Sequence, residues 1–263
     1  MTSNSCRIIA VANEKGGVGK TVTVINLSAA LQMQGHSVLV VDMDPQANTS
    51  AGLGVSAAEG APSTYDLIRD PKAFSATAAV VATRWDGLDV LPAHTDLAGA
   101  DIELVNEYGR ENRLKRALQS VDGRYDFIIL DTPPSLSLLT VNVFAAAREV
   151  LVPCQTHPYA YAALAELFDT IDTIKEAINT DLAVSGILAT LFDRRTRVSH
   201  EVLAKLRADE RYNRYLFDTV IRNNTTIAES ADAGTPVVYY RTTSFGAEDY
   251  RQLAAEVIKR KAT

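Results

Sequence analysis

The residues with the clearest chemical character form a run of glycines and lysines near the N-terminus. Lys15-Gly16-Gly17-Val18-Gly19-Lys20-Thr21 follows an apolar segment, residues 7–12, and precedes a segment with helical spacing, residues 22–34. In the order strand, loop, helix, such a loop aims backbone N–H groups and a helix N-terminus at one point, which makes an anion site. Glycines let the backbone approach phosphates closely, Lys20 adds a point charge, and the Thr21 hydroxyl can ligate Mg²⁺.

This loop departs from the common phosphate-binding pattern at one position. The pattern G-x-x-x-x-G-K-[ST] needs glycine at position 14, where the chain has Glu14, and an extra lysine, Lys15, opens the loop. A glycine-rich turn without a ligand is the simpler alternative. The agreement of strand, loop, two lysines, threonine and helix favours a nucleotide site. Its expected nucleotide-binding residues are Lys15, Gly16, Gly17, Val18, Gly19, Lys20, Thr21 and Val22.

Carboxylates stand at the ends of two apolar segments that are typical of buried strands. Asp42 ends the segment over residues 37–42 and Asp44 follows it; Asp131 ends the segment over residues 125–131, where Thr-Pro-Pro stops the strand. A phosphate-bound Mg²⁺ needs oxygen ligands at such places, so Asp131 is a candidate metal ligand of the Walker B kind. The alternatives are a strand-ending aspartate that caps the next turn and two loop aspartates that face solvent.

The elements that must position these residues alternate between strand-like and helix-like segments along the whole chain. The alternation predicts an α/β fold in which a mostly parallel sheet carries helices on both faces. We expect a single domain over residues 1–263. Strands are expected at 7–12, 37–42, 87–92, 125–131, 150–153, 184–192 and 216–221. Helices are expected at 22–34 (closed by Gly35), 63–70 (from a Ser cap), 97–121 (broken near Gly109), 135–147, 160–178, 199–211 and 245–261, and a loop at 47–63.

Composition excludes several classes of protein. Hydrophobic residues make up 47% of the 263 residues, and no apolar run approaches the roughly 20 residues that span a bilayer. We expect no signal peptide and a cytoplasmic location, with Cys6 and Cys154 as buried thiols rather than a disulfide or zinc ligands. The net charge of -6 and pI of about 5.3 argue against nucleic-acid binding by the whole surface.

The sequence resembles the ParA/MinD family of ATPases, whose deviant Walker A pattern is K-G-G-x-G-K-[ST]. The resemblance extends to residues 42–48, 130–135 and 151–156, and residues 244–250 look like the family's [SK]-x-GAExY stretch. These segments are closer to the partitioning ATPases ParA and Soj than to MinD. Nitrogenase iron protein is also less similar, because neither Cys6 nor Cys154 lies where its cluster-ligating cysteines would.

The resemblance implies roles for individual residues. Asp42 would sit near Mg²⁺ with Thr21 and Asp131, and Asp44 would orient the attacking water. Lys15 would reach across a dimer interface to the partner's nucleotide, so that two ATP molecules are sandwiched between two subunits. Lys15, Lys20 and Asp44 are therefore the expected catalytic residues of a slow ATPase. Asn224 falls where the family's adenine-contacting asparagine would be.

Basic residues concentrate in one segment of this acidic chain. Between residues 193 and 222, eight basic and five acidic side chains give a net charge of +3. We expect non-specific DNA contacts from Arg194, Arg195, Arg197 and Arg222; the alternative is an ordinary solvated helix face. Relatives commonly read Thr-Val-Ile-Pro-Arg-Asn where this chain has residues 219–224, and Thr226 replaces a second basic residue. The DNA surface is therefore expected to be weaker or rearranged.

The sequence thus predicts an ATPase that segregates a plasmid or chromosome, or positions a protein cargo. Its ATP dimer would bind nucleoid DNA, and a ParB-like or adaptor protein with a basic N-terminal segment would stimulate its release. One alternative is a membrane-cycling ATPase like MinD, since the last helix has an apolar stripe at Tyr250, Leu253, Ala254, Val257 and Ile258 and a basic tip at Lys259, Arg260 and Lys261. Packing of that helix on the sheet is favoured, and membrane binding is not expected. The other alternative is an ATP-switched scaffold or regulator with little turnover.

Overall fold

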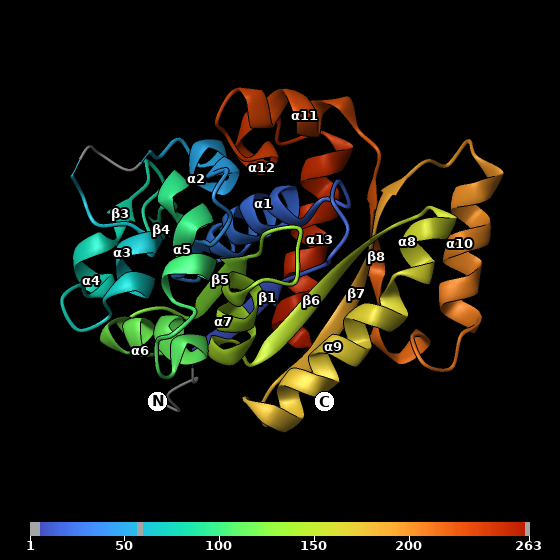
Figure 1. Cartoon of the computed structure of the whole chain (residues 1–263). Coiled ribbons are helices and arrows are strands. Elements are labelled where there is room, and N and C mark those ends of the chain that lie inside the picture. Colours follow the sequence, from blue (N-terminus) through green and yellow to red (C-terminus); the bar gives the residue numbers. More distant parts are fainter. Residues whose placement is uncertain (1–5, 57–59, 261–263) are drawn as a thin grey trace.

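An eight-stranded sheet forms the centre of the computed structural model, which describes residues 6–56 and 60–260 (Figure 1). The strand order is β3-β4-β2-β5-β1-β6-β7-β8, and every described pairing is parallel except the one between β3 and β4 at one edge. The strands are β1 (Arg7–Val11), β2 (Val38–Asp42), β3 (Val81–Ala82), β4 (Leu88–Leu91), β5 (Phe127–Asp131), β6 (Glu149–Gln155), β7 (Ala183–Phe192) and β8 (Leu216–Arg222). The predicted α/β architecture is confirmed.

Helices connect these strands and cover both faces of the sheet. They are α1 (Lys20–Met33), α2 (Asn48–Gly52), α3 (Thr64–Arg69), α4 (Ala76–Ala79), α5 (Ala100–Glu103), α6 (Arg113–Leu118), α7 (Leu138–Ala146), α8 (Pro158–Ala162), α9 (Leu164–Ala177), α10 (Arg197–Ala208), α11 (Thr225–Asp232), α12 (Val237–Tyr240) and α13 (Phe245–Lys259). Short 3₁₀ turns lie at η1 (Thr95–Gly99), η2 (Arg110–Asn112), η3 (Gln119–Val121) and η4 (Asn213–Tyr215).

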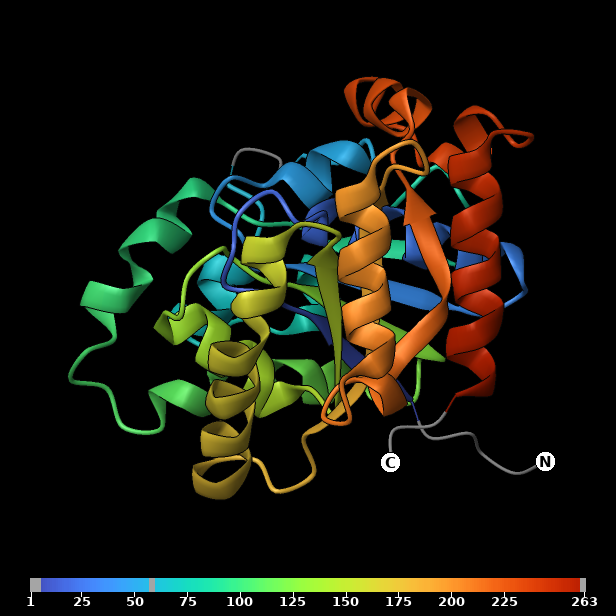
Figure 2. The same cartoon turned by 90° about the vertical axis from the view of Figure 1, so that its right-hand side faces the viewer.

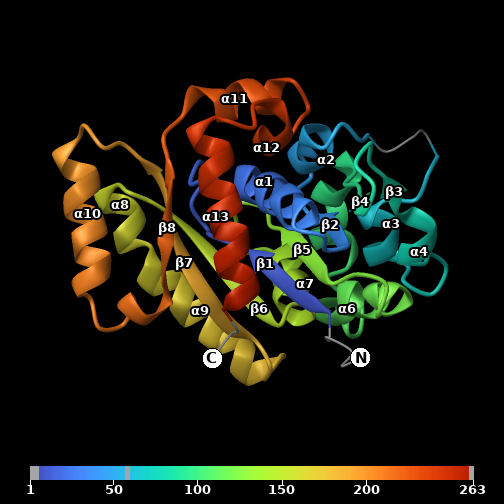
Figure 3. The ribbon, with the colours of Figure 1, turned by 180° about the vertical axis from the view of Figure 1, so that it is seen from behind.

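Two apolar layers hold the helices against the sheet. Alternate side chains of the central strands point to opposite faces, so strands buried on both sides are apolar throughout. On one face, α3, α6, α7 and α9 pack in a layer that includes Leu130 and Val152. On the other, α1, α12 and α13 pack over Ile129 and Leu151. Figure 3 shows α1 and α13 on this face of the sheet, seen from behind. Figure 2 shows α10 and α13 near the β8 edge of the sheet.

Most predicted elements are present, and their ends have local causes. Ser63 caps α3 in a capping box with Asp66, as expected of a Ser cap. Gly35 ends α1 in the left-handed region at φ +89°, which a side chain would disfavour. The predicted break at Gly109 is also present, at φ +64°, although the segment 97–121 forms short pieces rather than two long helices.

Two expectations about secondary structure were wrong, and two helices were not predicted. Residues 47–63 are not all loop, because α2 packs Gly52 against Ile25 of α1; residues 57–59 of that segment lie outside the described residues. The helix expected over residues 160–178 is two helices, α8 and α9, with Ala163 at the boundary. Helices α11 and α12 were not predicted, because tertiary contacts stabilise such short helices more than intrinsic propensity does.

The last helix packs on the sheet, as favoured. Tyr250, Leu253, Ala254 and Val257 of its apolar stripe are all buried, and they belong to the layer shared with α1. The helix ends at Lys259, and Lys261 of the predicted basic tip lies outside the described residues. Across residues 6–56 and 60–260, the helices are all too short or too polar to cross a membrane.

One close approach between strands gives a test of this packing. A Cβ atom added at Gly186 of β7 would lie 2.2 Å from the ring of Phe217 in β8. We expect Gly186→Ala to lower the free energy of unfolding by about 1–3 kcal/mol, because the ring has to move out of a packed layer. Urea unfolding measures this decrease. In a Phe217→Leu background, the same substitution should cost clearly less, and an equal cost in both backgrounds would contradict the predicted clash.

Candidate nucleotide and metal site

The loop between β1 and α1 has the backbone of a phosphate-binding loop. Gly17 and Gly19 adopt left-handed φ angles of +74° and +91°, which glycine reaches without strain. Gly19 is the N-cap of α1, and no side chain among the described residues caps that N-terminus. The first N–H groups of a helix of 14 residues are therefore directed at the space in front of the loop, where an anion would be stabilised.

The ammonium group of Lys20 lies inside this loop. The side chain is 7% exposed, and its Nζ donates to the carbonyl oxygen of Lys15 at 3.2 Å. Burial lowers the pKa of Lys20, while the charges of Asp131 and Asp44 act in the opposite direction. Lys20 thus lies between the loop and the two carboxylates, where its ammonium group can contact a bound phosphate chain.

Asp131 and Asp42 lie side by side at the ends of two neighbouring strands. The strand register pairs Asp42 of β2 with Asp131 of β5, and both residues are fully buried. Two hydroxyl groups donate to Asp131 Oδ2, that of Thr21 at 3.0 Å and that of Thr49 at 2.5 Å. The helix that starts at Lys20 therefore brings Thr21 directly to the strand end that carries Asp131.

Asp42 has its own set of donors. The backbone N–H and hydroxyl of Ser50 donate to Oδ2 at 2.8 and 2.7 Å, and the N–H of Asp44 donates to Oδ1 at 3.1 Å. Burial is the main reason why the pKa of both Asp42 and Asp131 is raised. Repulsion by the charges of neighbouring aspartates raises both pKa values further. These hydrogen bonds offset only part of the cost of burying two negative charges.

This donor set fits a small hard cation. Carboxylate and hydroxyl oxygens are the ligands that Mg²⁺ takes, and a divalent charge would compensate the two buried carboxylates. In the described part of the chain, no three His, Cys, Asp or Glu side chains form a metal cage of their own. That agrees with Mg²⁺, which is usually bound by one or two carboxylates together with phosphates and waters.

A cavity of about 450 Å³ opens in front of the loop and contains several of the predicted residues. Its walls come from the loop and α1, from the ends of β7 and β8, and from α11 and α13. The lining residues are Gly16, Gly17, Gly19, Lys20, Thr21, Val22, Asp44, Asn48, Pro134, Thr190, Leu191, Ile221, Arg222, Asn223, Asn224, Ile227, Ala228 and Tyr250. One end is therefore polar and rich in N–H groups, and the other is apolar, which suits a phosphate chain joined to a flat base.

Asn224 and Asp44 both line this cavity, as expected of site residues. Asn224 is the N-cap of α11, and its Oδ1 accepts from the N–H of Thr226 at 2.8 Å. Among residues 6–56 and 60–260 its amide nitrogen has no acceptor, so it can donate to a ligand. Asp44 is 9% exposed, and its Oδ1 accepts from the N–H of Gln46 at 3.0 Å. The turn that follows is strained, because Ala47 has a φ of +52°.

Two predicted loop residues point elsewhere. Val18 is fully buried, and its carbonyl oxygen accepts from the hydroxyl of Thr190 at 2.8 Å, so it connects the loop to β7 rather than lining the cavity. Lys15 also lies outside the cavity wall, and its Nζ stands 5.6 Å from the centre of the Tyr159 ring.

Several site residues were not predicted from the sequence. Thr49 and Ser50 donate to the two buried aspartates, and Ile227 and Tyr250 line the cavity. Hydroxyls shortly after an Asp-x-Asp pair could have signalled the first two. The second two had no local signal, because they come from the far end of the chain.

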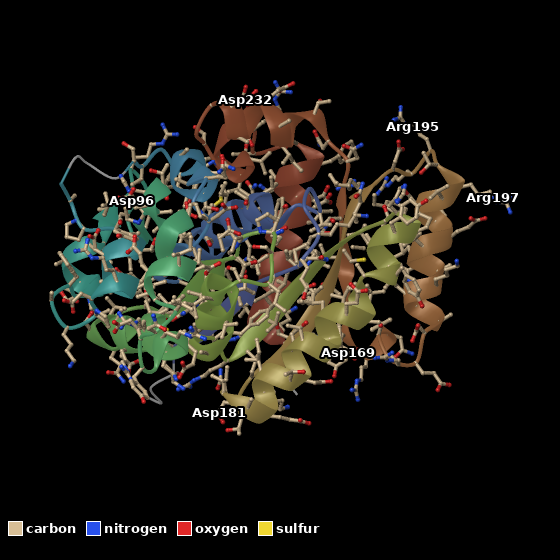
Figure 4. The ribbon with its side chains drawn as sticks, viewed as in Figure 1. Asp96, Asp169, Asp181, Arg195, Arg197 and Asp232 are labelled. Carbon is tan, nitrogen blue, oxygen red and sulfur yellow. The ribbon has the colours of Figure 1, made fainter. Side chains whose placement is uncertain are left out.

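Of the expected DNA-contacting residues, three lie together at the start of α10. Arg194, Arg195 and Arg197 are exposed, and Figure 4 shows Arg195 and Arg197 extending away from the body of the protein. Arg195 pairs with Asp193 at 2.9 Å and Arg197 with Glu201 at 2.7 Å. Surface pairs of this kind are weak, so both guanidinium groups can exchange partners readily.

Arg222 does not belong to that surface. Its guanidinium donates to both oxygens of Asp249, pairs with Glu248 at 3.2 Å, and stands 4.3 Å from the centre of the Phe245 ring. The side chain is only 15% exposed and lines the cavity. This geometry makes Arg222 a weaker candidate for DNA contact than the three arginines at α10, because Nε and Nη2 are already engaged within the fold.

Comparison with known proteins gives consistent matches. The family described as "AAA domain" matches residues 6–184. Soj, the sporulation initiation inhibitor protein of Bacillus subtilis, is 42% identical over 95% of this chain and 98% of its own length. The chromosome partitioning protein ParA of Myxococcus xanthus is 41% identical over 97% of this chain and 88% of its own.

Two solved structures with the same fold were determined with a bound nucleotide. A Mycobacterium smegmatis structure described as cobyrinic acid a,c-diamide synthase with a bound ATP analogue and magnesium has a TM-score of 0.82 at 36% identity, covering 97% of this chain and 95% of its own. The septum site-determining protein MinD from Pyrococcus horikoshii, complexed with Mg-ADP, has a TM-score of 0.76 at 25% identity, covering 97% and 96%.

The buried carboxylate pair generates a prediction about the cation. We expect Asp131→Asn to lower the affinity for Mg²⁺ in the presence of ADP by about 10- to 100-fold, because one of the two negative charges that attract the cation is removed. Isothermal titration calorimetry, in which Mg²⁺ is titrated into protein with ADP, measures this affinity. Asp122→Asn, an exposed change of the same charge before the other end of β5, is the matched control. Equal Mg²⁺ dependence in both variants would contradict the assignment.

Proposed function

This chain belongs to the ParA/Soj family of ATPases, and we propose that it works as a single ATPase domain, residues 1–263, which positions a DNA or protein cargo. One observation supports the proposal most directly: three features meet at the carboxyl ends of adjacent strands. They are the glycine loop with Lys20, the buried pair Asp42 and Asp131, and the cavity with one polar and one apolar end. That is the place where ligands bind in open α/β sheets.

We propose that the cavity binds ATP with Mg²⁺. The loop N–H groups and Lys20 would hold the β- and γ-phosphates, and Asn224 with the apolar end of the cavity would hold the base. Thr21, Asp42 and Asp131 would hold the cation, directly or through water. When bound, Mg²⁺ neutralises charge that develops on the phosphates during transfer.

Asp44 is proposed to orient the attacking water. It lines the cavity near the loop, and its backbone N–H is tied to Asp42, so its position relative to the cation site is restricted. A carboxylate among phosphates is a poor base, and the loose transition state of phosphoryl transfer gains more from a positioned nucleophile than from proton abstraction. Hydrolysis by the free protein is accordingly expected to be slow.

Lys15 is proposed to act on the nucleotide of a second subunit. Its ammonium group lies outside its own cavity, whose phosphate end already contains Lys20. A cation supplied in trans adds transition-state stabilisation only when the dimer forms, as an arginine finger does. ATP binding and dimerisation are then linked, so each strengthens the other.

The ATP dimer is proposed to bind DNA through Arg194, Arg195 and Arg197 and to be nucleoid-associated in the cytoplasm. Dimerisation would double this basic surface, and contacts with phosphates alone carry no sequence preference.

A ParB-like or adaptor protein with a basic N-terminal segment would stimulate hydrolysis, consistent with the acidic net charge of the chain. A membrane-cycling role like that of MinD is less favoured, because four of the five residues in the apolar stripe of α13 are buried.

We expect Asp44→Ala to accumulate an ATP-bound dimer, because nucleotide still binds while the water is no longer oriented. Size-exclusion chromatography with ATP and a phosphate-release assay measure the two effects. Lys15→Ala is the counterpart, which should retain ATP binding by the monomer and fail to dimerise. Rapid turnover or a monomeric Asp44→Ala protein would contradict the role of Asp44.

An ATP-switched regulator with little turnover would instead show a stable wild-type dimer that neither DNA nor partner destabilises.

We expect wild-type protein to bind random-sequence duplex DNA with ATP but not with ADP, and more weakly as salt rises. Replacing Arg194, Arg195 and Arg197 together with alanine should reduce the slope of log K against log salt by about 0.9 for each phosphate that the variant no longer neutralises. The matched control replaces Lys115, Arg116 and Arg124, three exposed basic residues around α6 at the other end of the sheet. Equal slopes in both variants would move the DNA surface elsewhere. Binding to anionic vesicles instead of DNA would favour a membrane-cycling ATPase.

A further inference from the structure

The ammonium group of Lys15 rests on an aromatic ring. Tyr159, in the first turn of α8, is 74% exposed, and its ring centre lies 5.6 Å from Lys15 Nζ. The ring of His157 stands 5.4 Å from that of Tyr159. An ammonium within about 6 Å of an aromatic ring centre is attracted by the negative face of the ring. Tyr159 is therefore an interaction partner of Lys15, although it belongs to no motif in the sequence.

The backbone of Lys15 is held from both sides. Its N–H donates to Asn13 Oδ1 at 2.9 Å, and its carbonyl oxygen accepts from Lys20 Nζ at 3.2 Å. Asn13 in turn donates through Nδ2 to the carbonyl oxygen of Pro153 in β6 at 2.8 Å. The starting point of the Lys15 side chain is thus fixed relative to β6, the strand that leads to α8.

The neighbouring residue fixes the same stretch to the next helix. Glu14, which stands where a common phosphate loop has glycine, accepts through Oε1 from the hydroxyl of Thr170 in α9 at 3.1 Å. Hydrogen bonds therefore connect the start of the loop to β6 and α9. The Lys15 side chain extends to α8, which lies between these two elements in the sequence.

The direction of Lys15 has an electrostatic consequence. Within residues 6–56 and 60–260, none of the ion pairs involves Lys15, and its ammonium group stands over the Tyr159 ring. A free lysine beside a triphosphate would be drawn to those phosphates, because opposite charges attract over several ångströms. In this subunit that position belongs to Lys20. A Lys15 that folded back would no longer be available to a second subunit.

We propose that Tyr159 is the positioning residue of Lys15, which keeps its ammonium group off the nucleotide of its own subunit and directs it to the phosphates bound by a second copy of this chain. The inference rests on the proposed function, since it requires Lys15 to act in trans. The ring restricts the side chain before the subunits meet, so less rotamer entropy is lost when the dimer forms. The face of the ring makes this contact, and the hydroxyl is not needed.

Tyr159→Leu and Tyr159→Phe form a matched pair for the test. Both replace an exposed side chain, so the fold should tolerate them, and only phenylalanine retains an aromatic face. We expect Tyr159→Leu to weaken the ATP-dependent dimer by about 5- to 30-fold, since two Lys15 side chains would then lose rotamer freedom when each dimer forms. Tyr159→Phe should match the wild type. Analytical ultracentrifugation with a non-hydrolysable ATP analogue measures dimerisation, and calorimetry under dilute conditions measures binding by the monomer.

The monomer's affinity for the analogue provides the readout that a general structural defect would not give. We expect it to be unchanged or tighter in Tyr159→Leu, because Lys15 is then free to contact its own nucleotide. In a Lys15→Ala background, which should not dimerise, Tyr159→Leu should leave the monomer's affinity for the analogue unchanged, because any tightening requires Lys15. An unchanged or tighter dimer in Tyr159→Leu, or an equal weakening in Tyr159→Phe, would overturn the proposal. Failure of the wild type to dimerise, or a normal dimer in Lys15→Ala, would instead overturn the proposed function of Lys15.

Discussion

The burial of two adjacent carboxylates is the constraint on which the rest of this site depends. Asp42 and Asp131 lie opposite each other at the ends of β2 and β5, with no exposure to solvent. Two such charges are costly unless hydrogen bonds and a cation compensate them. The side-chain hydrogen bonds come from Thr21 at the start of α1 and from Thr49 and Ser50 in α2. The contacts that offset this cost therefore also place the phosphate loop against the cation site.

The site is completed by the C-terminal part of the chain. The match to the AAA domain family ends at residue 184, whereas the apolar wall of the cavity comes from residues beyond it, such as Leu191, Ile227 and Tyr250. Thr190 connects β7 to the loop through the carbonyl of Val18, and Asp249 holds Arg222 at the end of β8. The phosphate end and the base end of the cavity thus belong to different halves of the chain, which the parallel sheet brings together.

Positive charge is distributed unevenly in this acidic chain. Lys20 is buried within the site, Lys15 is directed away from it, and the arginines at the start of α10 extend into solvent. These three positions correspond to the three contacts proposed above: with the subunit's own nucleotide, with that of a partner, and with DNA. Arg222, which the sequence grouped with the last set, is held inside the fold by Asp249 and Glu248, because its position at the end of β8 faces α13.

The sequence by itself determined the phosphate loop, the two strand-ending aspartates and the alternating α/β pattern. Each of these is a local signal, carried by neighbouring residues whose types restrict the backbone or end a strand. Tertiary structure alone decided that Thr49 and Ser50 solvate the aspartates, that Ile227 and Tyr250 line the cavity, and that Tyr159 contacts Lys15. It also decided that 160–178 divides at Ala163 and that Arg222 pairs with Asp249. The physical reason is that these contacts join residues far apart in the chain, whose meeting depends on strand order and register, and no local periodicity encodes either.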